Sequence, residues 1–322
     1  MKKFLIQVLI FTIPIIFTWS IILLIDPHNL YNISKIISND SKLLIINRSF
    51  ETQVRGNVLW KIFEFKRNPC KNIIIGDSQS YYMNEELIKK LTGSEYYNLS
   101  IPGANVDTKF TFFWFATTQT KLSNVIIQLS FPSLVMNKRE NVFHFAQDYM
   151  DKPYQYLFNS AVIKDIYQNI RYKISKKYEK EINQFEFPIS KNGNKLFDLS
   201  LEGMHKNFKY PNNYSEELEK IVNYCERNQI SLKFVLFPIH KRYYNYLIEN
   251  NLIKYYDQFI TEMNTTGKTY NYSKDSTIIN HDKNFIDFFH QNQSITDSLT
   301  SLVLRETNSQ ILNIINNEFE TK

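Results

Sequence analysis

The chain has 322 residues, of which 43% are hydrophobic, so it is long enough for one large domain with attached segments. Its formal charge is +6, from 38 Lys and Arg against 32 Asp and Glu, and the basic residues are spread along the chain. Nucleic-acid-binding proteins usually concentrate basic residues in a dense patch, so we expect no nucleic acid as a partner.

The first predicted element is an uncharged apolar stretch from Phe4 to Ile25 that follows Lys2 and Lys3. As a helix these 22 residues would be roughly 33 Å long, about the hydrocarbon thickness of a bilayer. No small-residue cleavage site follows, so the pattern predicts an uncleaved membrane anchor over 1–25. The Lys pair favours a cytoplasmic N-terminus, which makes the protein a single-pass protein of the cell membrane with its remainder extracytoplasmic.

Residues 26–69 are polar and mixed, and they are expected to form a linker and packing segment with short elements at 43–55 and 58–65. The segment opens with Asp-Pro-His-Asn-Leu-Tyr over 26–31. On the residues alone this motif is a helix stop, because Pro27 does not continue a helix comfortably.

The stretch Lys71–Ser80, K-N-I-I-I-G-D-S-Q-S, then predicts a short buried strand, a turn and a helix start. Ser78 would stand at the carboxyl end of that strand, the edge where ligands usually bind in an α/β sheet. Further strands are expected at 96–101, 124–130, 231–238 and 269–273, alternating with helices at 83–91, 108–118, 214–228, 241–263 and 294–319.

This alternation predicts an α/β fold with a doubly wound, mostly parallel sheet flanked by helices, over 70–322. The pattern changes between about 132 and 212, where charged and aromatic residues mix and proline interrupts helical stretches such as 164–181. We interpret these residues as a helical insertion at the carboxyl edge of the third strand, where it would cover the site and select the substrate. Cys70 and Cys225 are not expected side by side, although an oxidising compartment would permit a disulfide.

Three blocks resemble the SGNH (GDSL-type) hydrolase superfamily. They are Gly76-Asp77-Ser78, the segment Asn98-Leu-Ser-Ile-Pro-Gly103, and Asp287-Phe-Phe-His290, and their order and spacing agree with that family. The Asp-Pro motif beyond the apolar helix is similar to that of the membrane-anchored branch, which includes alginate O-acetylation proteins and the D-alanyl transfer protein of teichoic acid synthesis.

The resemblance implies a triad in which Ser78 is the nucleophile, His290 the general base and Asp287 its orienting partner. Without Ser78, a capping turn with a surface histidine would be the better interpretation of Asp287 and His290. Ser80 is more easily a helix cap than a reactive group. Substrate contact is the weaker alternative for His240, which follows the fourth strand.

An oxyanion hole needs two or three hydrogen-bond donors. The backbone N–H groups of Ser78 and Gly103 are the expected pair, the second by analogy with the family. Where many members carry a Gly-x-Asn-Asp block, this chain has Gln128-Leu-Ser-Phe-Pro132, so the third donor stays open between Asn105 and Ser130. The sequence has no two closely spaced cysteines and no His-x-x-x-His motif, and we expect neither a metal nor a cofactor.

These features predict an extracytoplasmic serine acyl-transfer enzyme that acts on a cell-surface polysaccharide. The triad does not separate an esterase from an O-acyltransferase, because water and a sugar hydroxyl attack the same acyl-enzyme. The anchor favours transfer, with acyl groups supplied by a membrane-bound O-acyltransferase partner, as the resemblance implies. The alternative is a non-catalytic glycan-binding or envelope assembly protein on a hydrolase fold, which the missing asparagine block favours.

Overall fold

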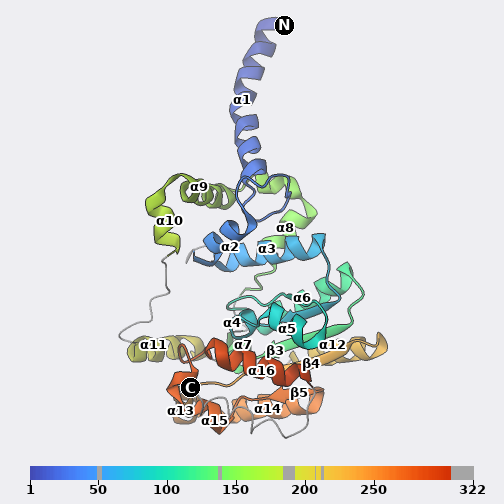
Figure 1. Cartoon of the computed structure of the whole chain (residues 1–322), viewed down its shortest axis with the longest axis vertical. Helices are drawn as coiled ribbons and strands as arrows, with labels where there is room; N and C mark the ends of the chain where they lie inside the picture. The colour runs from blue at the N-terminus through green and yellow to red at the C-terminus, as the bar shows by residue number, and fades with distance from the viewer. Residues whose placement is uncertain (49–52, 137–139, 184–192, 207, 212–213, 306–322) are drawn as a thin grey trace. The chain divides into compact units, whose positions relative to one another are not determined.

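A computed structural model describes residues 1–48, 53–136, 140–183, 193–206, 208–211 and 214–305. The chain divides into two compact units, coloured by residue number in Figure 1. Unit 1 comprises Met1–Asn68 and Val142–Pro188, and unit 2 comprises Pro69–Asn141 and Ile189–Lys322. The middle of the expected insertion therefore folds with the N-terminal segment, and both of its ends belong to unit 2.

Unit 1 is helical in the part of it that the structure describes. Its elements are α1 (Lys2–Ile25), α2 (Asn39–Arg48), α3 (Gln53–Arg67), α8 (His144–Asp151), η2 (Pro153–Phe158), α9 (Ser160–Ile174) and α10 (Lys176–Asn183). The helix expected over 164–181 is wrong as one element, because Ser175 takes an extended conformation between α9 and α10. Helix α1 is long and apolar enough to cross a membrane.

The residues that follow α1 form a fixed turn rather than a simple helix stop. Asp26 takes a left-handed conformation with φ of 38°, and it is buried. Its carboxylate accepts hydrogen bonds from the backbone N–H groups of Leu30, Tyr31 and Asn32, at 2.7–3.0 Å. The acidic side chain is thus consumed in closing the turn, which explains why an aspartate ends the apolar run.

Unit 2 contains a five-stranded sheet in which every neighbouring pair of strands is parallel. The spatial order is β2-β1-β3-β4-β5, with bounds of Asn72–Ile75 for β1, Tyr97–Asn98 for β2, Asn124–Leu129 for β3, Ser231–Leu236 for β4 and Thr269–Asn271 for β5. The register pairs Ile74 of β1 with Ile126 of β3, and Ile126 with Lys233 of β4. This confirms the predicted parallel α/β sheet.

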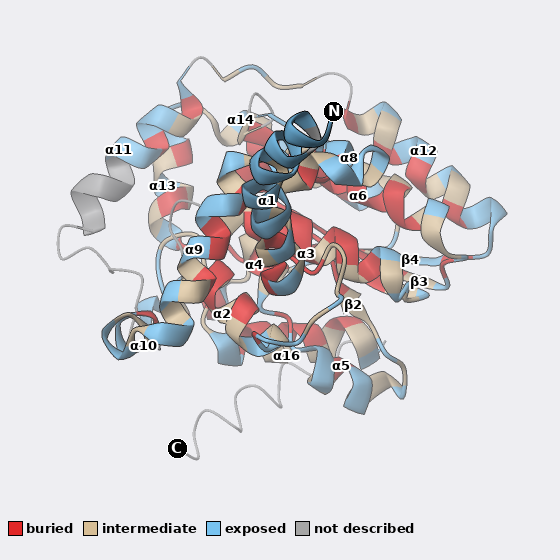
Figure 2. Ribbon diagram, turned by 90° about the horizontal axis from the view of Figure 1, so that it is seen from above, coloured by how far each residue is buried: buried red, intermediate tan, exposed pale blue. Residues whose placement is uncertain are grey.

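Helices cover both faces of this sheet, which explains the continuous apolar runs of its central strands. On one face, α5 (Glu85–Thr92) and α16 (Gln293–Arg305) pack together, and Ile88, Leu299 and Val303 join the core with Ile74 and Ile126. The other face is covered by α6 (Val106–Gln119), α12 (Tyr214–Arg227) and α14 (Ile253–Thr266). The central strands β1 and β3 consist almost entirely of buried residues, the class that Figure 2 colours red.

The remaining helices in the described part of unit 2 are mostly short. They are α4 (Ser78–Tyr81), α7 (Phe131–Val135), α11 (Gly193–His205), α13 (Lys241–Glu249), α15 (Ser276–Ile279) and η3 (Asp282–Asn284). The long helix expected over 241–263 is wrong, because the chain breaks at Asn251, whose φ of 56° is left-handed. The second strand is shorter than 96–101, although Leu99 and Ile101 still donate to the backbone of Ile74 and Gly76.

The two cysteines and the C-terminal helix were also considered from the sequence. Cys70 and Cys225 are both free thiols, and Cys225 is buried in α12. The helix predicted over 294–319 is seen as α16 up to Arg305, and its remainder lies outside the described residues.

Candidate active site

The site begins at the turn that follows β1, where only glycine fits. A Cβ atom on Gly76 would overlap the Ser80 hydroxyl and lie 2.6 Å from Gln128 Oε1. Asp77 then caps α4 by accepting a hydrogen bond from the backbone N–H of Gln79 at 2.9 Å. Ser78 is the first residue of α4, so its side chain leaves the sheet at the carboxyl end of β1. In the order β2-β1-β3, this point is where the strand order reverses, the usual ligand position in such sheets.

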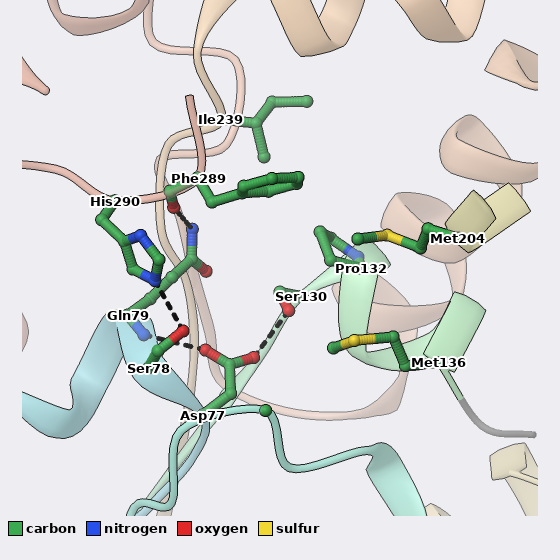
Figure 3. Close-up of a pocket in the computed structure, with 11 residues that line it drawn as sticks. Asp77, Ser78, Gln79, Ser130, Pro132, Met136, Met204, Ile239, Phe289 and His290 are labelled. Carbon is green, nitrogen blue, oxygen red and sulfur yellow. Dashed lines mark hydrogen bonds between the residues drawn. The ribbon is translucent and has the colours of Figure 1, made fainter. Parts of the chain in front are cut away.

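The structure brings the three predicted triad side chains together, although His290 is 212 residues after Ser78 in sequence. Ser78 Oγ lies 2.7 Å from His290 Nε2, and both oxygens of Asp287 lie 2.8 Å from His290 Nδ1 (Figure 3 shows the first pair). Asp287 Oδ1 also accepts the backbone N–H groups of Phe289 and His290, at 2.7 and 2.9 Å. The carboxylate is therefore held by its own turn and by the imidazole together.

These bonds decide the charge of Asp287. Burial by itself would raise the pKa of this carboxyl group, but the hydrogen bond and charge of His290 and the two backbone N–H groups lower it below its ordinary value. An ionised Asp287 accepts a hydrogen bond from Nδ1–H, which leaves Nε2 as the acceptor that faces the Ser78 hydroxyl. This is the tautomer that a general base for Ser78 requires.

A buried ion pair lies directly beneath the nucleophile. Lys109 of α6 is fully buried, and its Nζ lies 2.8 Å from Asp77 Oδ2. The same oxygen accepts a hydrogen bond from the Ser130 hydroxyl at 2.7 Å. Burial alone would raise the pKa of Asp77, but Lys109, the Gln79 N–H and Ser130 outweigh it and hold the pKa below its ordinary value. The Asp77 side chain is thus a charged anchor for the turn.

Two glutamines connect this anchor to the loop that carries His290. Gln79 Nε2 donates to the carbonyl of Phe289 at 3.0 Å, and Gln128 Nε2 donates to Gln79 Oε1 at 3.0 Å. Gln128 Oε1 in turn accepts the Asp77 N–H at 2.9 Å. Gln291 adds a bond to the backbone carbonyl of Gln79 at 3.2 Å. The nucleophile and base loops are therefore joined through buried amide groups.

Four residues of the site were not predicted from the sequence as site residues, namely Gln79, Gln128, Gln291 and Lys109. Gln128 lies in the segment where the resemblance leads one to expect an asparagine block, and its side chain bridges β3 to the Gly-Asp-Ser turn. Lys109 had a weaker signal, a basic residue on a helix whose buried side is mostly apolar.

The expected oxyanion donors fall into two groups. Gly103, with a left-handed φ of 75°, lines the pocket together with Ser78. Asn105 is instead the N-cap of α6, where its side-chain oxygen Oδ1 accepts the Thr108 N–H, and it is not among the lining residues. Ser130 lines the pocket, but its hydroxyl proton is directed at Asp77.

A cavity of about 190 Å³ opens above the triad. Its polar side holds Asp77, Ser78, Gln79, Gly103, Ser130 and His290, and its other side is apolar, formed by Pro132, Met136, Met204, Ile239 and Phe289 (Figure 3). Pro132, Met136 and Met204 come from the two ends of the expected insertion that belong to unit 2.

The helix cap expected at Ser80 is wrong, and His240 lies outside the cavity lining. Asp77, not Ser80, caps α4, and Ser80 is buried with its hydroxyl 2.8 Å from that of Ser100. His240 accepts the Arg242 N–H as the N-cap of α13 and lies 3.1 Å from Asp282, and it does not line the cavity. Among the described residues, no group of three or more His, Cys, Asp or Glu could hold a metal ion.

Comparison with known proteins adds little to this geometry. No family model matches the chain. No curated protein matches it either. Among solved structures, one described as "a putative platelet activating factor from Streptococcus pneumonia" is similar at 11% sequence identity with a TM-score of 0.40, over 82% of this chain and 98% of that one. A likeness this distant supports no argument about the site.

Proposed function

We propose that the protein is a serine acyl-transfer enzyme of the SGNH type. The observation that carries this proposal is the relay from Ser78 Oγ to His290 Nε2 at 2.7 Å and from Nδ1 to Asp287 at 2.8 Å, at the mouth of a cavity. Buried structural histidines do not require a serine and a carboxylate on opposite ring nitrogens, whereas nucleophile activation does.

The proposed reaction has two steps. Ser78 Oγ attacks the carbonyl carbon of an ester or thioester while its proton passes to His290 Nε2, and the same proton then leaves with the departing alcohol or thiol. The acyl group is now an ester of Ser78. In the second step His290 removes a proton from a sugar hydroxyl or water, which attacks that ester and releases Ser78 Oγ, reprotonated by His290. The N–H groups of Ser78 and Gly103 would stabilise the oxyanion in both steps.

The cavity favours a short, uncharged acyl group. Its volume of about 190 Å³ is comparable with a roughly 150 Å³ apolar cavity that accommodates benzene. Its apolar side carries no charged group among the described residues, and the Asp77 carboxylate is already bonded to Lys109, Ser130 and Gln79. An aminoacyl group would therefore have no counter-charge for its ammonium, which favours an acetyl-like cargo over a D-alanyl cargo.

The acceptor in this proposal is a hydroxyl of a cell-surface polysaccharide, with hydrolysis as the outcome when water replaces it. Helix α1 would hold the enzyme in the cell membrane with its site extracytoplasmic, near a membrane-bound O-acyltransferase that supplies acyl groups. The experiment is active-site labelling of the full-length protein in detergent with a fluorophosphonate, which phosphonylates an activated serine.

We expect a mass shift on the peptide that contains Ser78, and hydrolysis of p-nitrophenyl acetate that exceeds hydrolysis of the alanine p-nitrophenyl ester. Ser78→Ala and His290→Ala should each abolish labelling, whereas His281→Ala, a histidine that does not line the cavity, should retain it. An unlabelled Ser78 in a folded protein would reject catalysis and favour the glycan-binding alternative.

A further inference from the structure

Unit 1 exposes an unusual number of large apolar side chains. Apart from Met1 and α1, the described residues of this unit include seven of them: Ile33, Ile36, Tyr154, Phe158, Ile163, Tyr167 and Ile174. Unit 2 is larger and has four, namely Tyr82, Leu199, Ile248 and Ile286. The excess lies mainly between residues 154 and 174, that is in η2 and α9. Clusters of this kind mark interaction surfaces rather than ordinary solvent-exposed faces.

Helix α9 presents an apolar face outward as well as inward. Ile163, Tyr167 and Ile174 are 44%, 63% and 77% exposed, and spacings of four and seven residues place all three on one side of the helix. The buried side carries Val162 and Ile166 instead. A helix on a water-facing surface normally has a polar outer face, so the outer face of α9 is suited to an apolar medium.

The segment of η2 and α9 contacts the candidate membrane helix. The ring of Phe158, at the end of η2, lies edge-on to Trp19 of α1 with centroids 5.2 Å apart, and α9 packs against α1. Trp19 is six residues before Ile25, roughly 9 Å along the helix, where tryptophan commonly meets the membrane–water interface. In Figure 1, α9 runs crosswise to α1 near the end of α1 that is farther from the N-terminus.

The same segment is basic. Between Lys152 and Asn183 the chain has seven Lys and Arg and three Asp and Glu: Lys152, Lys164, Arg171, Lys173, Lys176, Lys177 and Lys180 against Asp165, Glu179 and Glu181. Asp165 is buried and paired with Arg55 and His28, so it contributes no negative charge to the surface. Basic side chains that flank an apolar helix face complement anionic lipid headgroups.

We propose that η2 and α9 form a second membrane contact beside α1. Phe158, Ile163, Tyr167 and Ile174 enter the headgroup region of the leaflet through which α1 leaves the bilayer, and the neighbouring Lys and Arg residues meet anionic lipids. The inference depends on the proposed anchoring by α1 and is independent of the chemistry at Ser78. Unit 1 would then be held at the membrane by two contacts, α1 and the segment of η2 and α9.

The test places an environment-sensitive fluorophore at one introduced cysteine at a time in the full-length protein in nanodiscs, in a Cys70→Ser background whose remaining thiol, Cys225, is buried. The labelled variants are Ile174→Cys and Tyr167→Cys, with Phe11→Cys of α1 as the membrane reference. Ile248→Cys, an exposed isoleucine of unit 2, is the aqueous reference. Nitroxide-bearing lipids quench only fluorophores that reach the bilayer.

We expect the labels at 167 and 174 to be quenched several-fold more than the label at 248, and more strongly in phosphatidylglycerol nanodiscs than in phosphatidylcholine nanodiscs. Quenching at Phe11 with none at 167 and 174 would overturn the inference and leave the anchor intact. Shielding of 167 and 174 only in native membranes, not in nanodiscs, would also overturn it and assign the face to a protein partner. No quenching at Phe11 would instead reject the anchoring on which the inference depends.

Discussion

At the scale of single residues, the site depends on side chains that do not take part in bond making. Gln79 is adjacent to the nucleophile, yet its amide group bonds to the carbonyl of Phe289 in the loop of the base. Its own partner, Gln128, is bonded to the Gly-Asp-Ser turn. The distance between Ser78 and His290 is therefore controlled by an amide chain outside the triad.

Gln79→Ala should slow fluorophosphonate labelling of Ser78 by about 10- to 100-fold, because small displacements of a base from its nucleophile have effects of this size. The same substitution should change the unfolding temperature only slightly. Gln293→Ala is the matched control, since Gln293 also bonds to a backbone carbonyl, that of Tyr82, but away from the cavity. Equal labelling rates in the Gln79 and Gln293 variants would contradict a positioning role.

Lys109→Met should destabilise the protein by about 3–5 kcal/mol, because it leaves the buried Asp77 carboxylate without its counter-charge. The double variant Asp77→Asn/Lys109→Met should recover much of this loss, since it removes both charges. Thermal unfolding in detergent gives the stabilities of the wild type, the single variant and the double variant. A single variant as stable as the wild type would show that the pair at 2.8 Å contributes little.

The same pair predicts an acid sensitivity. The pKa of Asp77 in the folded protein lies below its ordinary value of 3.8, so its ionisation stabilises the fold above that value and the stabilisation is lost as the pH falls through the lower, folded pKa. Lys109 is protonated in folded and unfolded chains in this acid range, so it adds no slope. The double variant should therefore lose less stability than the wild type between pH 5 and about pH 2. If the unfolding temperatures of the wild type and the double variant fell by the same amount between these two pH values, this prediction would be contradicted.

At the scale of elements, the turn between β1 and α4 decides where the nucleophile stands. The turn is closed by Gly76, by the Asp77 cap and by Ser80 and Gln128 packed behind it. Gly203 in α11 provides a contrast, because nothing lies within 4 Å of the position that its Cβ atom would take.

Gly76→Ala should destabilise unit 2 by about 1–3 kcal/mol and abolish labelling of Ser78, because the added methyl group meets Ser80 and Gln128. Gly203→Ala is the control and should be neutral or stabilising by up to about 1 kcal/mol, since alanine is the better helix former. Both values come from thermal unfolding. Retained labelling in Gly76→Ala would show that the turn tolerates a side chain.

At the scale of the whole molecule, the chain combines a helical unit that includes the candidate membrane helix with an α/β unit that includes the site. The orientation of α1 determines on which side of the membrane Ser78 would act. Lys2 and Lys3 favour a cytoplasmic N-terminus, and Lys42 on the opposite side is buried and bonded to Asn29.

A membrane-impermeant maleimide applied to intact cells should label Lys35→Cys but not Lys2→Cys, in a Cys70→Ser background. Residue 35 is exposed after α1, and residue 2 should become reactive only after the cells are opened. Labelling of residue 2 in intact cells, with residue 35 protected, would reverse the orientation and place the proposed site in the cytoplasm.

The amino-acid sequence by itself determined the parallel α/β sheet and the apolar N-terminal helix, and the resemblance of three short blocks implied the triad of Ser78, Asp287 and His290. These features depend on local signals: apolar runs, the glycine that ends β1, and an Asp and a His three residues apart on one turn. Only the tertiary structure decided that residues 142–188 fold with the N-terminal segment, that Asn105 is a helix cap, and that Asn251 divides one predicted helix into two. It also supplied Lys109, Gln79 and Gln128, because their roles are hydrogen bonds across 32 to 210 residues of sequence. Such partners are chosen by how the layers pack and by the cost of leaving a buried polar group unpaired, and neither is written in a local pattern.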